Sequence, residues 1–466
     1  MKRITPAAVV FVPLAALFVS GSALAVPPPI PGAPEIAGVP AWQPSASIFL
    51  TRSEALAHLG RVAAWDKGMQ ATACVDPDAG IDAGQELCRF GGIIEVESGP
   101  GNNIVESDNT QEAVFTWSFH RSLTMAATYK PQEDNAFEYL ATHPGYLEWR
   151  DGNGTGPNSY SIYNCGWGVR AVLEYEAATG DMSKHAYGDT CAMHIYDNAG
   201  VTVNGTLIDA ATSGWAAAGL WMWGDATSQA TMKAKASAIG GLVKAWIDQT
   251  PSRVASRTWA VTGGAAFYGV MGSYMKDHPG EQASWVATIA PQLAGYVDSS
   301  QPVGANDWTD WRNAHSAWNM LAQFTAADAI GGSDGDMHRQ IALDALAKLV
   351  AQDTDNDGAI PGSQQRPATE DQSWITAYLV YFGLRPVLTA ADVGDAGAPD
   401  ASGSVDAAVA NDAGVDGGGN GATGGSSSSS GCGCTVAGVD GSAWGAIGSA
   451  LVVVGAAARR RRRTVR

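Results

Sequence analysis

Acidic side chains gather in four polar stretches that each precede or open a helix-forming segment, and carboxyl groups of this kind can carry acid–base chemistry. The stretches read "NNIVESDNTQEA", "EWRDGNG", "NDWTDWRNAH" and "TEDQSW". Hydrolysis of a glycosidic bond requires a pair of carboxyl groups, one protonated and one ionised. Acidic residues at helix starts can also serve only as caps, which is the alternative interpretation. The predicted catalytic carboxyl groups are those of Asp108, Glu112, Asp151, Asp310 and Asp371.

Aromatic and basic side chains accompany these carboxyl groups. Aromatic faces stack on sugar rings, although tryptophans inside helices are more often part of a core. His315, one helical turn beyond a tryptophan, is a further catalytic candidate. A lyase would instead use Tyr160 or His315 as its base, with Asn or Arg neutralising a uronate carboxylate. The predicted substrate-binding residues are Trp149, Arg150, Tyr160, Trp308, Trp311 and Trp374.

The segment "DTDNDG" places Asp353, Asp355 and Asp357 at the spacing that opens a calcium-binding loop. The twelfth position of such a loop should be glutamate, and here it is Gln364. A carboxylate from Glu370 or Asp371 would have to complete the site. A calcium ion is therefore the one cofactor considered, and a capped turn between two helices is the alternative. P-loop and HExxH motifs do not occur in the sequence.

Six cysteines fall into three pairs along the sequence. In an oxidising compartment, Cys74–Cys88 and Cys165–Cys191 are expected to form disulfides. The spacing of Cys and His does not match a zinc site. Cys432 and Cys434 stand apart in the tail and require a different explanation.

A pattern of paired helices recurs about every 50 residues. These helices would position the candidate catalytic and substrate-binding side chains. Each first helix is rich in small residues and tryptophan, and each second helix is more amphipathic. With a leading helix at 54–69, six first helices and five partners make six pairs, which predicts an all-α (α/α)6 toroid. First helices are expected at 112–129, 165–179, 213–225, 263–277, 313–328 and 371–383. Second helices are expected to begin near Asp134, Asp181, Ser228, Glu281 and Asp336.

The segment "LVAQDTDNDGAIPGSQQRPATEDQSWITAYLVYFGL" resembles one repeat of squalene-cyclase and prenyltransferase-type toroids. The shared features are a helix ending near Gln352, the Asp-x-Asp-Gly turn and the Asp-x-x-Trp helix start. The six pairs likewise resemble the six-hairpin glycosidase type of toroid. The resemblance implies architecture rather than chemistry, and terpene cyclisation is disfavoured because DxDD and DDxxD are missing from the sequence.

The connections between helices are unequal in length. Turns from first to second helices are short, whereas the loops at 93–111, 141–164, 198–212 and 299–312 are long. All the long loops must open at one rim of the toroid, where the first helices begin. Long loops on a rigid scaffold commonly carry sites. We therefore expect the site in the central cavity at this rim.

Both ends of the chain have the composition of targeting segments. Residues 1–25 have the charged start, apolar run and Ala-Leu-Ala site of a secretory signal peptide, with an uncleaved anchor as the alternative. A proline-rich leader at 26–47 then precedes the toroid domain at 48–388. Residues 389–431 form an Asp/Ala/Gly/Ser tether that is expected to be disordered.

The tail at 432–466 combines Gly-Cys-Gly-Cys, an uncharged run at 441–458 and a block of arginines. The run is about the minimum length for a transmembrane helix, and the arginines would stay on the cytoplasmic side. This order of parts resembles the MYXO-CTERM sorting signal of myxobacterial surface proteins. The resemblance implies cleavage by a sorting protease near Cys432 and Cys434, lipid attachment and display on the cell surface. A plain single-span anchor is the alternative.

The net charge of −18 disfavours nucleic acid and anionic lipid as partners. The sequence therefore predicts an exported protein that is anchored at the cell envelope and faces outward. We expect it to act on extracellular polysaccharide by glycoside hydrolysis. A polysaccharide lyase and a non-catalytic glycan-binding or adhesive protein are the alternatives.

Overall fold

The computed structural model describes residues 52–73, 89–98, 102, 104–147, 159–258, 260–293, 311–363, 366 and 368–390. Several predicted features lie outside these residues: the signal peptide, the leader, the tether, the sorting segment and the long loops that enter two of the inner helices. Within the described ranges, the helices are either too short or too polar to cross a bilayer. The predicted site residues that lie outside are Cys74, Cys88, Trp149, Arg150, Asp151, Trp308, Asp310, Cys432 and Cys434.

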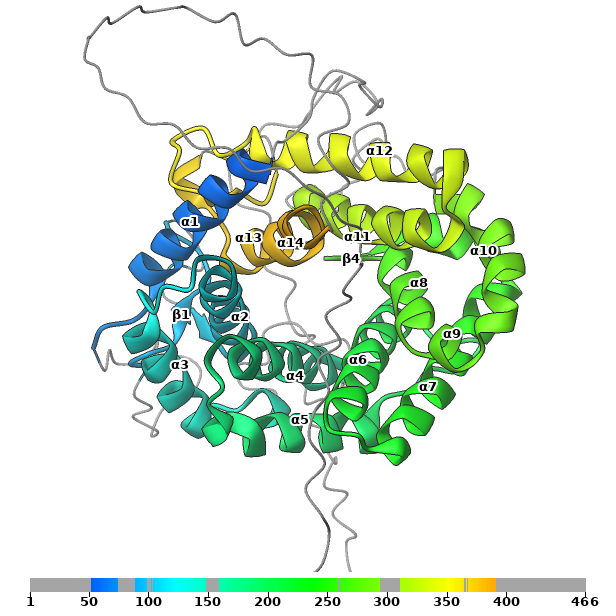
Figure 1. Cartoon of the computed structure of the whole chain (residues 1–466), viewed down its shortest axis with the longest axis horizontal. Helices are drawn as coiled ribbons and strands as arrows, with labels where there is room; N and C mark the ends of the chain where they lie inside the picture. Colours follow the sequence, from blue (N-terminus) through cyan, green and yellow to red (C-terminus); the bar gives the residue numbers. More distant parts are fainter. Residues whose placement is uncertain are drawn as a thin grey trace, which may run out of the picture. The chain divides into compact units, whose positions relative to one another are not determined.

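Six helices form a closed inner ring (Figure 1). Each contacts the next along the chain, and the last contacts the first. The sixth continues through a π-helical turn at Leu379–Leu384 into α14 (Arg385–Thr389). The ring consists of α2 (Ser107–Thr124), α4 (Ser159–Thr179), α6 (Leu207–Ala226), α8 (Gly263–Gly272), α11 (Arg312–Ile330) and α13 (Ser373–Tyr378).

A second set of helices surrounds this ring. α3, α5, α7 and α12 each contact the inner helix that precedes them, whereas α10 contacts the following inner helix, α11. α1 contacts α13 and α14, so the first and last helical segments of the domain complete the sixth pair. This arrangement confirms the predicted (α/α)6 toroid. The outer helices are α1 (Arg52–Met69), α3 (Lys130–Thr142), α5 (His185–Asn198), α7 (Ala230–Gln249), α10 (Pro279–Leu293) and α12 (Gly332–Val350), with α9 (Tyr274–Asp277) between α8 and α10.

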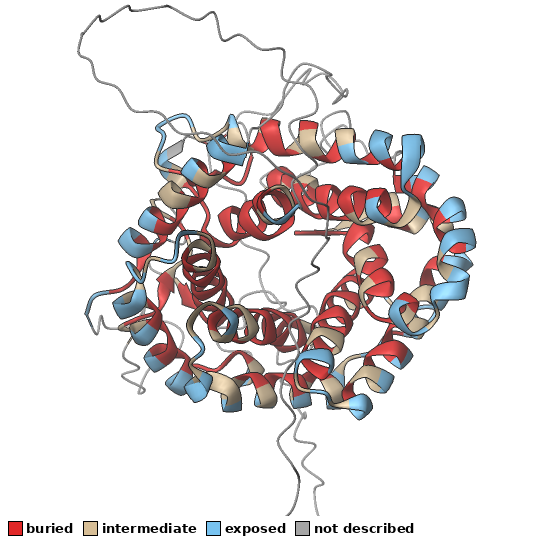
Figure 2. Ribbon diagram, viewed as in Figure 1, coloured by how far each residue is buried: buried red, intermediate tan, exposed pale blue. Residues whose placement is uncertain are grey.

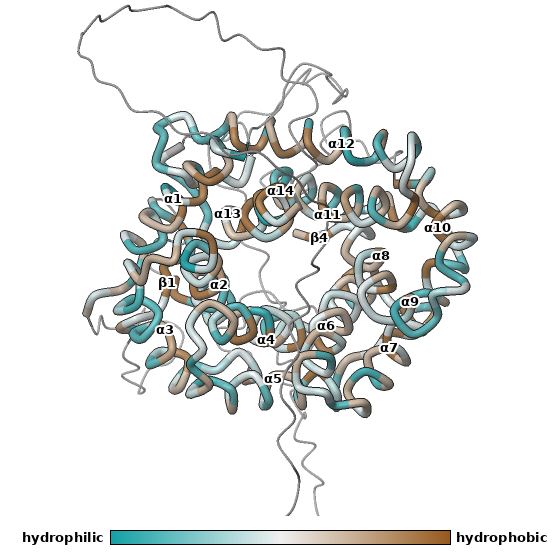
Figure 3. The backbone as a smooth tube through the Cα atoms, viewed as in Figure 1, coloured by the Kyte–Doolittle hydropathy of each residue, from teal (hydrophilic) through white to brown (hydrophobic). Residues whose placement is uncertain are grey.

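The inner and outer helices differ in how much of their surface is buried. The inner helices are buried around most of their circumference, whereas the outer helices expose one side (Figure 2). The outer helices accordingly alternate between hydrophilic and hydrophobic positions along their length (Figure 3). In α7 the buried side chains include Met232, Ala236, Ile239 and Val243, a spacing that follows one helical face.

Small residues allow the inner helices to approach closely. A Cβ atom added to Gly269 of α8 would lie 2.2 Å from the Cα atom of Gly214 in α6. The backbones of the two helices therefore touch at this point, and a larger residue would force them apart. α6 begins at a capping box in which Thr206 and Asp209 satisfy each other's backbone N–H groups.

Two short antiparallel hairpins, which the sequence did not predict, stand before two inner helices. β1 (Ile93–Ile94) pairs with β2 (Val105–Glu106), directly before α2. β3 (Arg257–Thr258) pairs with β4 (Val261–Thr262), directly before α8. Strands of only two residues are too short to leave a periodic pattern in the sequence. Both hairpins lie at the ends where inner helices begin, on the rim that was expected to carry the site.

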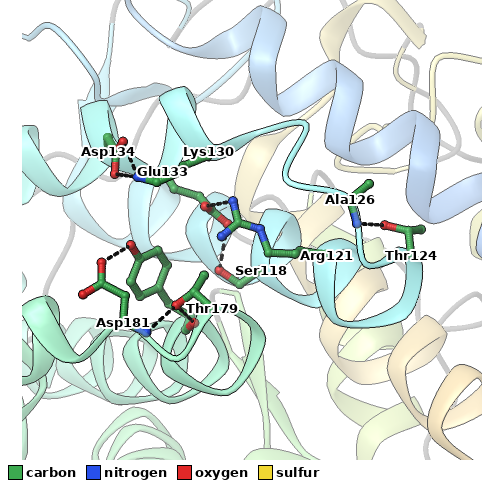
Figure 4. A network of polar contacts seen from close by, with 10 residues as sticks. Ser118, Arg121, Thr124, Ala126, Lys130, Glu133, Asp134, Thr179 and Asp181 are labelled. Carbon is green, nitrogen blue, oxygen red and sulfur yellow. Dashed lines mark hydrogen bonds and ion pairs between the residues drawn. The ribbon is translucent and has the colours of Figure 1, made fainter.

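The opposite end of α2 is joined to α3 by a buried ion pair (Figure 4). Arg121 Nη2 lies 2.6 Å from Glu133 Oε2, and both side chains are buried. The Ser118 hydroxyl donates to the other oxygen of Glu133 at 3.2 Å. Nearby, Lys130 and Asp134 form a second ion pair that is half exposed. The two pairs have the same charges but very different access to water.

The predicted Cys165–Cys191 disulfide is not formed in the structure, where both cysteines are free and buried. Burial, and then the neighbouring Cys191 thiol, raise the pKa of the Cys165 thiol well above its usual value. A buried neutral thiol behaves as a small apolar group. These residues therefore join α4 to α5 by packing.

Candidate active site

The first turns of α2 carry a buried set of polar side chains at the rim. Every residue from Glu106 to Glu112 is buried, including three with carboxyl groups. The β1–β2 hairpin holds this segment in place, because the Thr110 hydroxyl accepts from the backbone N–H of Ile93 at 3.1 Å. The helix starts five residues earlier than the sequence predicted, since tertiary contacts bury polar side chains that are typical of a loop.

Tyr160 of α4 joins two carboxyl groups of this segment. Its hydroxyl lies 2.9 Å from Glu106 Oε2 and 2.8 Å from Asp108 Oδ2. Burial raises the pKa of Asp108 above its usual value, and hydrogen bonds from Tyr160, from the backbone N–H of Asn109 and from Glu106 offset this rise only in part. Burial and the two carboxylates raise the pKa of Tyr160 well above its usual value. Tyr160 therefore acts as a neutral hydrogen-bond donor.

Glu112 lies one helical turn further into the ring. Its Oε1 atom accepts from the Tyr163 hydroxyl at 3.1 Å, and its Oε2 atom is buried without a hydrogen-bond partner. Burial, and then the charge of Asp108, raise the pKa of Glu112 well above its usual value. Tyr163 is itself positioned by the indole N–H of Trp167, which donates to its hydroxyl at 2.8 Å.

Asp108 and Glu112 therefore have different environments, although both are nearly inaccessible to solvent (3% and 1% exposed). Asp108 lies at the start of a helix and accepts hydrogen bonds from a backbone N–H and from a hydroxyl. These interactions favour its ionised form. Glu112 accepts one hydrogen bond, from the Tyr163 hydroxyl, and lies near the negative charge of Asp108. This environment favours its neutral form. Two carboxyl groups with such different environments are typical of an acid–base pair.

Aromatic side chains continue from Glu112 across the rim. The Tyr163 hydroxyl is hydrogen-bonded to the hydroxyl of Tyr378 in α13. The Tyr378 ring lies 5.5 Å from that of Trp374, which lies 4.9 Å from the ring of Trp311 at the start of α11. The structure thus joins predicted catalytic and predicted sugar-binding residues through two tyrosines.

His315 is buried in the first turns of α11. Arg312, three residues before His315 in the first turn of that helix, is almost completely buried, and the three nitrogens of its guanidinium group have no hydrogen-bond partner. The sequence analysis did not single out Arg312. It stands next to Trp311 at the rim.

Below the carboxyl groups, a buried arginine fills the middle of the ring. The Arg170 guanidinium stacks 3.4 Å from the centre of the Trp215 ring and donates to the carbonyl oxygens of Gly166 and Trp215. Its Nε–H also donates to the Tyr381 hydroxyl at 3.0 Å. Although burial by itself raises the pKa of Tyr381, the charge of Arg170 lowers it overall. This packing closes the ring below the rim.

Five acidic residues form a separate acidic cluster: the predicted Asp353, Asp355, Asp357 and Asp371, together with Glu97. Ligand atoms of Glu97, Asp357 and Asp371 lie within 4.8 Å of one another, and so do those of the three loop aspartates. Burial, and then the four neighbouring carboxylates, raise the pKa of Asp371 to about 9. Asp371 was predicted to be catalytic, but its neighbours are these carboxylates rather than Asp108 and Glu112. We therefore remove it from the catalytic candidates.

The neutral state of Glu112 predicts a pH dependence of stability. Because its pKa is higher in the folded than in the unfolded chain, the folded chain binds one more proton above about pH 5. The stabilisation is complete below the unfolded pKa and is lost as the pH rises through the folded pKa. Glu112→Gln removes the titrating group and therefore this contribution to the pH dependence. The free energy of unfolding should then fall less steeply with pH in the variant, and the two slopes should differ by up to about 1.4 kcal/mol per pH unit.

The measurement is urea unfolding of both chains at several pH values from 5 upward. Asp344→Asn is the control, because it changes a buried carboxyl group to an amide on the outer helix α12. Equal slopes for the wild type and Glu112→Gln would contradict a neutral Glu112.

Comparisons with known proteins give structural similarity only. The chain is similar to the α-1,6-mannanase GH76A of Salegentibacter sp. HEL1_6, with a TM-score of 0.49 and 11% identity over 72% of this chain and 99% of that one. An inactive variant of that mannanase is in complex with α-1,6-mannotriose. An unsaturated glucuronyl hydrolase specific for heparin gives a TM-score of 0.45 and 12% identity over 72% of this chain and 95% of that one. No protein-family model and no curated protein sequence matches the chain. Identities this low do not identify a substrate, so function is inferred from the side chains of the rim.

Three functional candidates emerge that the sequence analysis did not single out as site residues. Tyr163 and Tyr378 contact each other although they are far apart in the chain, and Glu106 shares Tyr160 with Asp108. The spacing of Tyr160 and Tyr163 on one helical face was the available signal for Tyr163. No local pattern marks Tyr378 as its partner.

Proposed function

We propose that the chain is a glycoside hydrolase in which Glu112 is the general acid and Asp108 is the ionised carboxylate. The supporting observation is the difference between their environments, one turn apart on the same face of α2.

In the proposed reaction, Glu112 gives its proton to the oxygen of the leaving sugar as the glycosidic bond breaks. Asp108 either attacks the anomeric carbon in the same step, after which water hydrolyses the glycosyl ester with Glu112 as the base, or takes a proton from a water that attacks this carbon directly. Tyr160 and Tyr163 hold the two carboxyl groups in place through their hydroxyls. The aromatic pair of Trp311 and Trp374 would stack on a sugar ring.

A polysaccharide lyase is a weaker interpretation of the same residues. The raised pKa of Tyr160 makes its phenolate a rare species at neutral pH, so this residue is poorly suited to be the base. Its hydroxyl faces two carboxyl groups, which would repel a uronate. A non-catalytic glycan-binding protein would use the aromatic residues but would not need a buried neutral acid.

We propose that this reaction takes place outside the cell, at the cell surface. The support is the composition of residues 1–25 and of the tail at 432–466. On this proposal a sorting protease and the membrane are partners of the tail, and extracellular polysaccharide is the partner of the rim.

The test is incubation of the full-length chain with a panel of polysaccharides, followed by assays of reducing ends and of absorbance at 235 nm. New reducing ends without absorbance at 235 nm are expected. Products that absorb at 235 nm would indicate a lyase, and binding without release would indicate a glycan-binding protein. Either result would contradict the proposal.

A further inference from the structure

The acidic cluster brings together carboxylates from three separate segments of the chain. Asp353, Asp355 and Asp357 come from the loop after α12, Glu97 follows β1, and Asp371 precedes α13. Asp357 belongs to both groups of ligand atoms that lie within 4.8 Å of one another. The five side chains therefore form one continuous cluster that is connected through Asp357.

Asp371 shows that the cluster is more than an acidic patch on the surface. Its side chain is fully buried, and neither carboxylate oxygen has a hydrogen-bond partner. One oxygen of Glu97 and one of Asp353 are also buried without a partner. Unpaired buried carboxylates are costly, and neighbours of the same sign increase the cost. A cation bound within the cluster would satisfy all three.

The loop at 353–358 contains a sharp turn at Gly358 that packs against α1. Gly358 has a φ of +103°, and a Cβ atom there would lie 2.4 Å from the backbone nitrogen of Val62 in α1. Asp353 accepts from Arg61 Nη2 at 3.3 Å, which leaves its other oxygen unpaired. Glycine at the sixth position of an Asp-x-Asp-x-Asp-Gly loop permits the sharp turn that calcium loops require.

We propose that these five carboxylates bind one Ca²⁺ ion. Glu97 and Asp371 replace the glutamate that usually closes such a loop, since the twelfth position is Gln364. Ca²⁺ takes six to eight oxygen ligands in flexible geometry, which suits five carboxylates from three segments. Mg²⁺ prefers an octahedral shell that retains several waters, and Zn²⁺ prefers nitrogen and sulfur ligands.

The position of the site implies a structural role, which is independent of the proposed hydrolase activity. The backbone N–H of Glu97 donates to the carbonyl oxygen of Asp371 at 3.0 Å, and that of Ser373 donates to Glu95 at 2.9 Å. Asp353 contacts Arg61 of α1. The ion would therefore join the segment before the first inner helix to the start of the last one, where the ring closes.

The test is thermal unfolding of the full-length chain, first with EDTA and then with excess CaCl₂ or MgCl₂. We expect Ca²⁺ to raise Tm by about 5 °C or more at a hundredfold excess over Kd, and Mg²⁺ to raise it less. Calorimetric titration of the EDTA-treated chain should give one more Ca²⁺ site than titration of Asp371→Asn. An unchanged Tm in Ca²⁺, or a larger rise in Mg²⁺, would overturn the proposal.

Asp371→Asn separates ion binding from a general loss of stability. Without Ca²⁺ this variant should have a Tm close to that of the wild type at neutral pH, because the amide has the same size and charge as the neutral acid that it replaces. It should gain little when Ca²⁺ is added. Asp328→Asn, an exposed carboxylate on α11, is the control and should respond to Ca²⁺ as the wild type does. If Asp371→Asn and the wild type gained equally, the site would be elsewhere and the proposal would be wrong.

Discussion

Glutamine in place of Glu112 should lower kcat by about a thousandfold on the polysaccharide that the chain cleaves. The amide keeps the hydrogen bond from Tyr163 but has no proton to give to the leaving oxygen. General acid catalysis contributes about 10² to 10⁴ in rate, so the loss should fall within this range. Asp108→Asn should cause a similar loss, because it removes the ionised partner. Steady-state release of reducing ends measures both variants.

An activated substrate distinguishes the two roles. An aryl glycoside with a good leaving group does not need the proton, so Glu112→Gln should recover most of its activity on it, whereas Asp108→Asn should not. Asp344→Asn, the buried control on α12, should keep wild-type activity. Equal losses in all three variants would show that the effects are structural and would contradict the assigned roles.

Methionine in place of Arg121 should lower the free energy of unfolding by about 3 to 5 kcal/mol. The substitution leaves Glu133 buried without its positive partner, and an unpaired buried charge carries a large cost. Denaturant unfolding followed by circular dichroism measures the change. Because the pair lies at the end of α2 opposite the rim, the loss concerns stability rather than chemistry.

The neighbouring ion pair provides the matched control (Figure 4). Lys130→Met removes the partner of Asp134 from a half-exposed site, where the cost should be about 0.5 kcal/mol or less. Replacing both Arg121 and Glu133 with methionine should recover most of the stability lost in the single variant. A cost below 1 kcal/mol for Arg121→Met would contradict the burial of the pair.

The ring could be predicted from the sequence because its signal is repeated. Small residues and aromatic residues recur on each inner helix, and the leading helix at 54–69 supplies the missing sixth partner. In the structure α1 contacts α13 and α14, as the predicted six pairs of helices require. The start of α2 could not be predicted, because Ser107 to Gln111 are polar and become helical only through tertiary burial.

The candidate site was predicted in part. Asp108, Glu112 and Tyr160 lie together because they occupy the starts of neighbouring inner helices, which follows from the topology. The contact between Tyr163 and Tyr378 joins residues from opposite ends of the domain, and no local pattern indicates it. Asp371 was assigned to catalysis since its position at a helix start resembles that of Asp108, yet the chain folds it against Asp357.

The most direct test of hydrolysis at the rim is cleavage of the polysaccharide panel in H₂¹⁸O, with mass spectrometry of the products. Hydrolysis places one ¹⁸O atom at each new reducing end, and Glu112→Gln should release no labelled product above background. Products that carry a double bond and no ¹⁸O, or the absence of cleavage from every polysaccharide, would contradict the account.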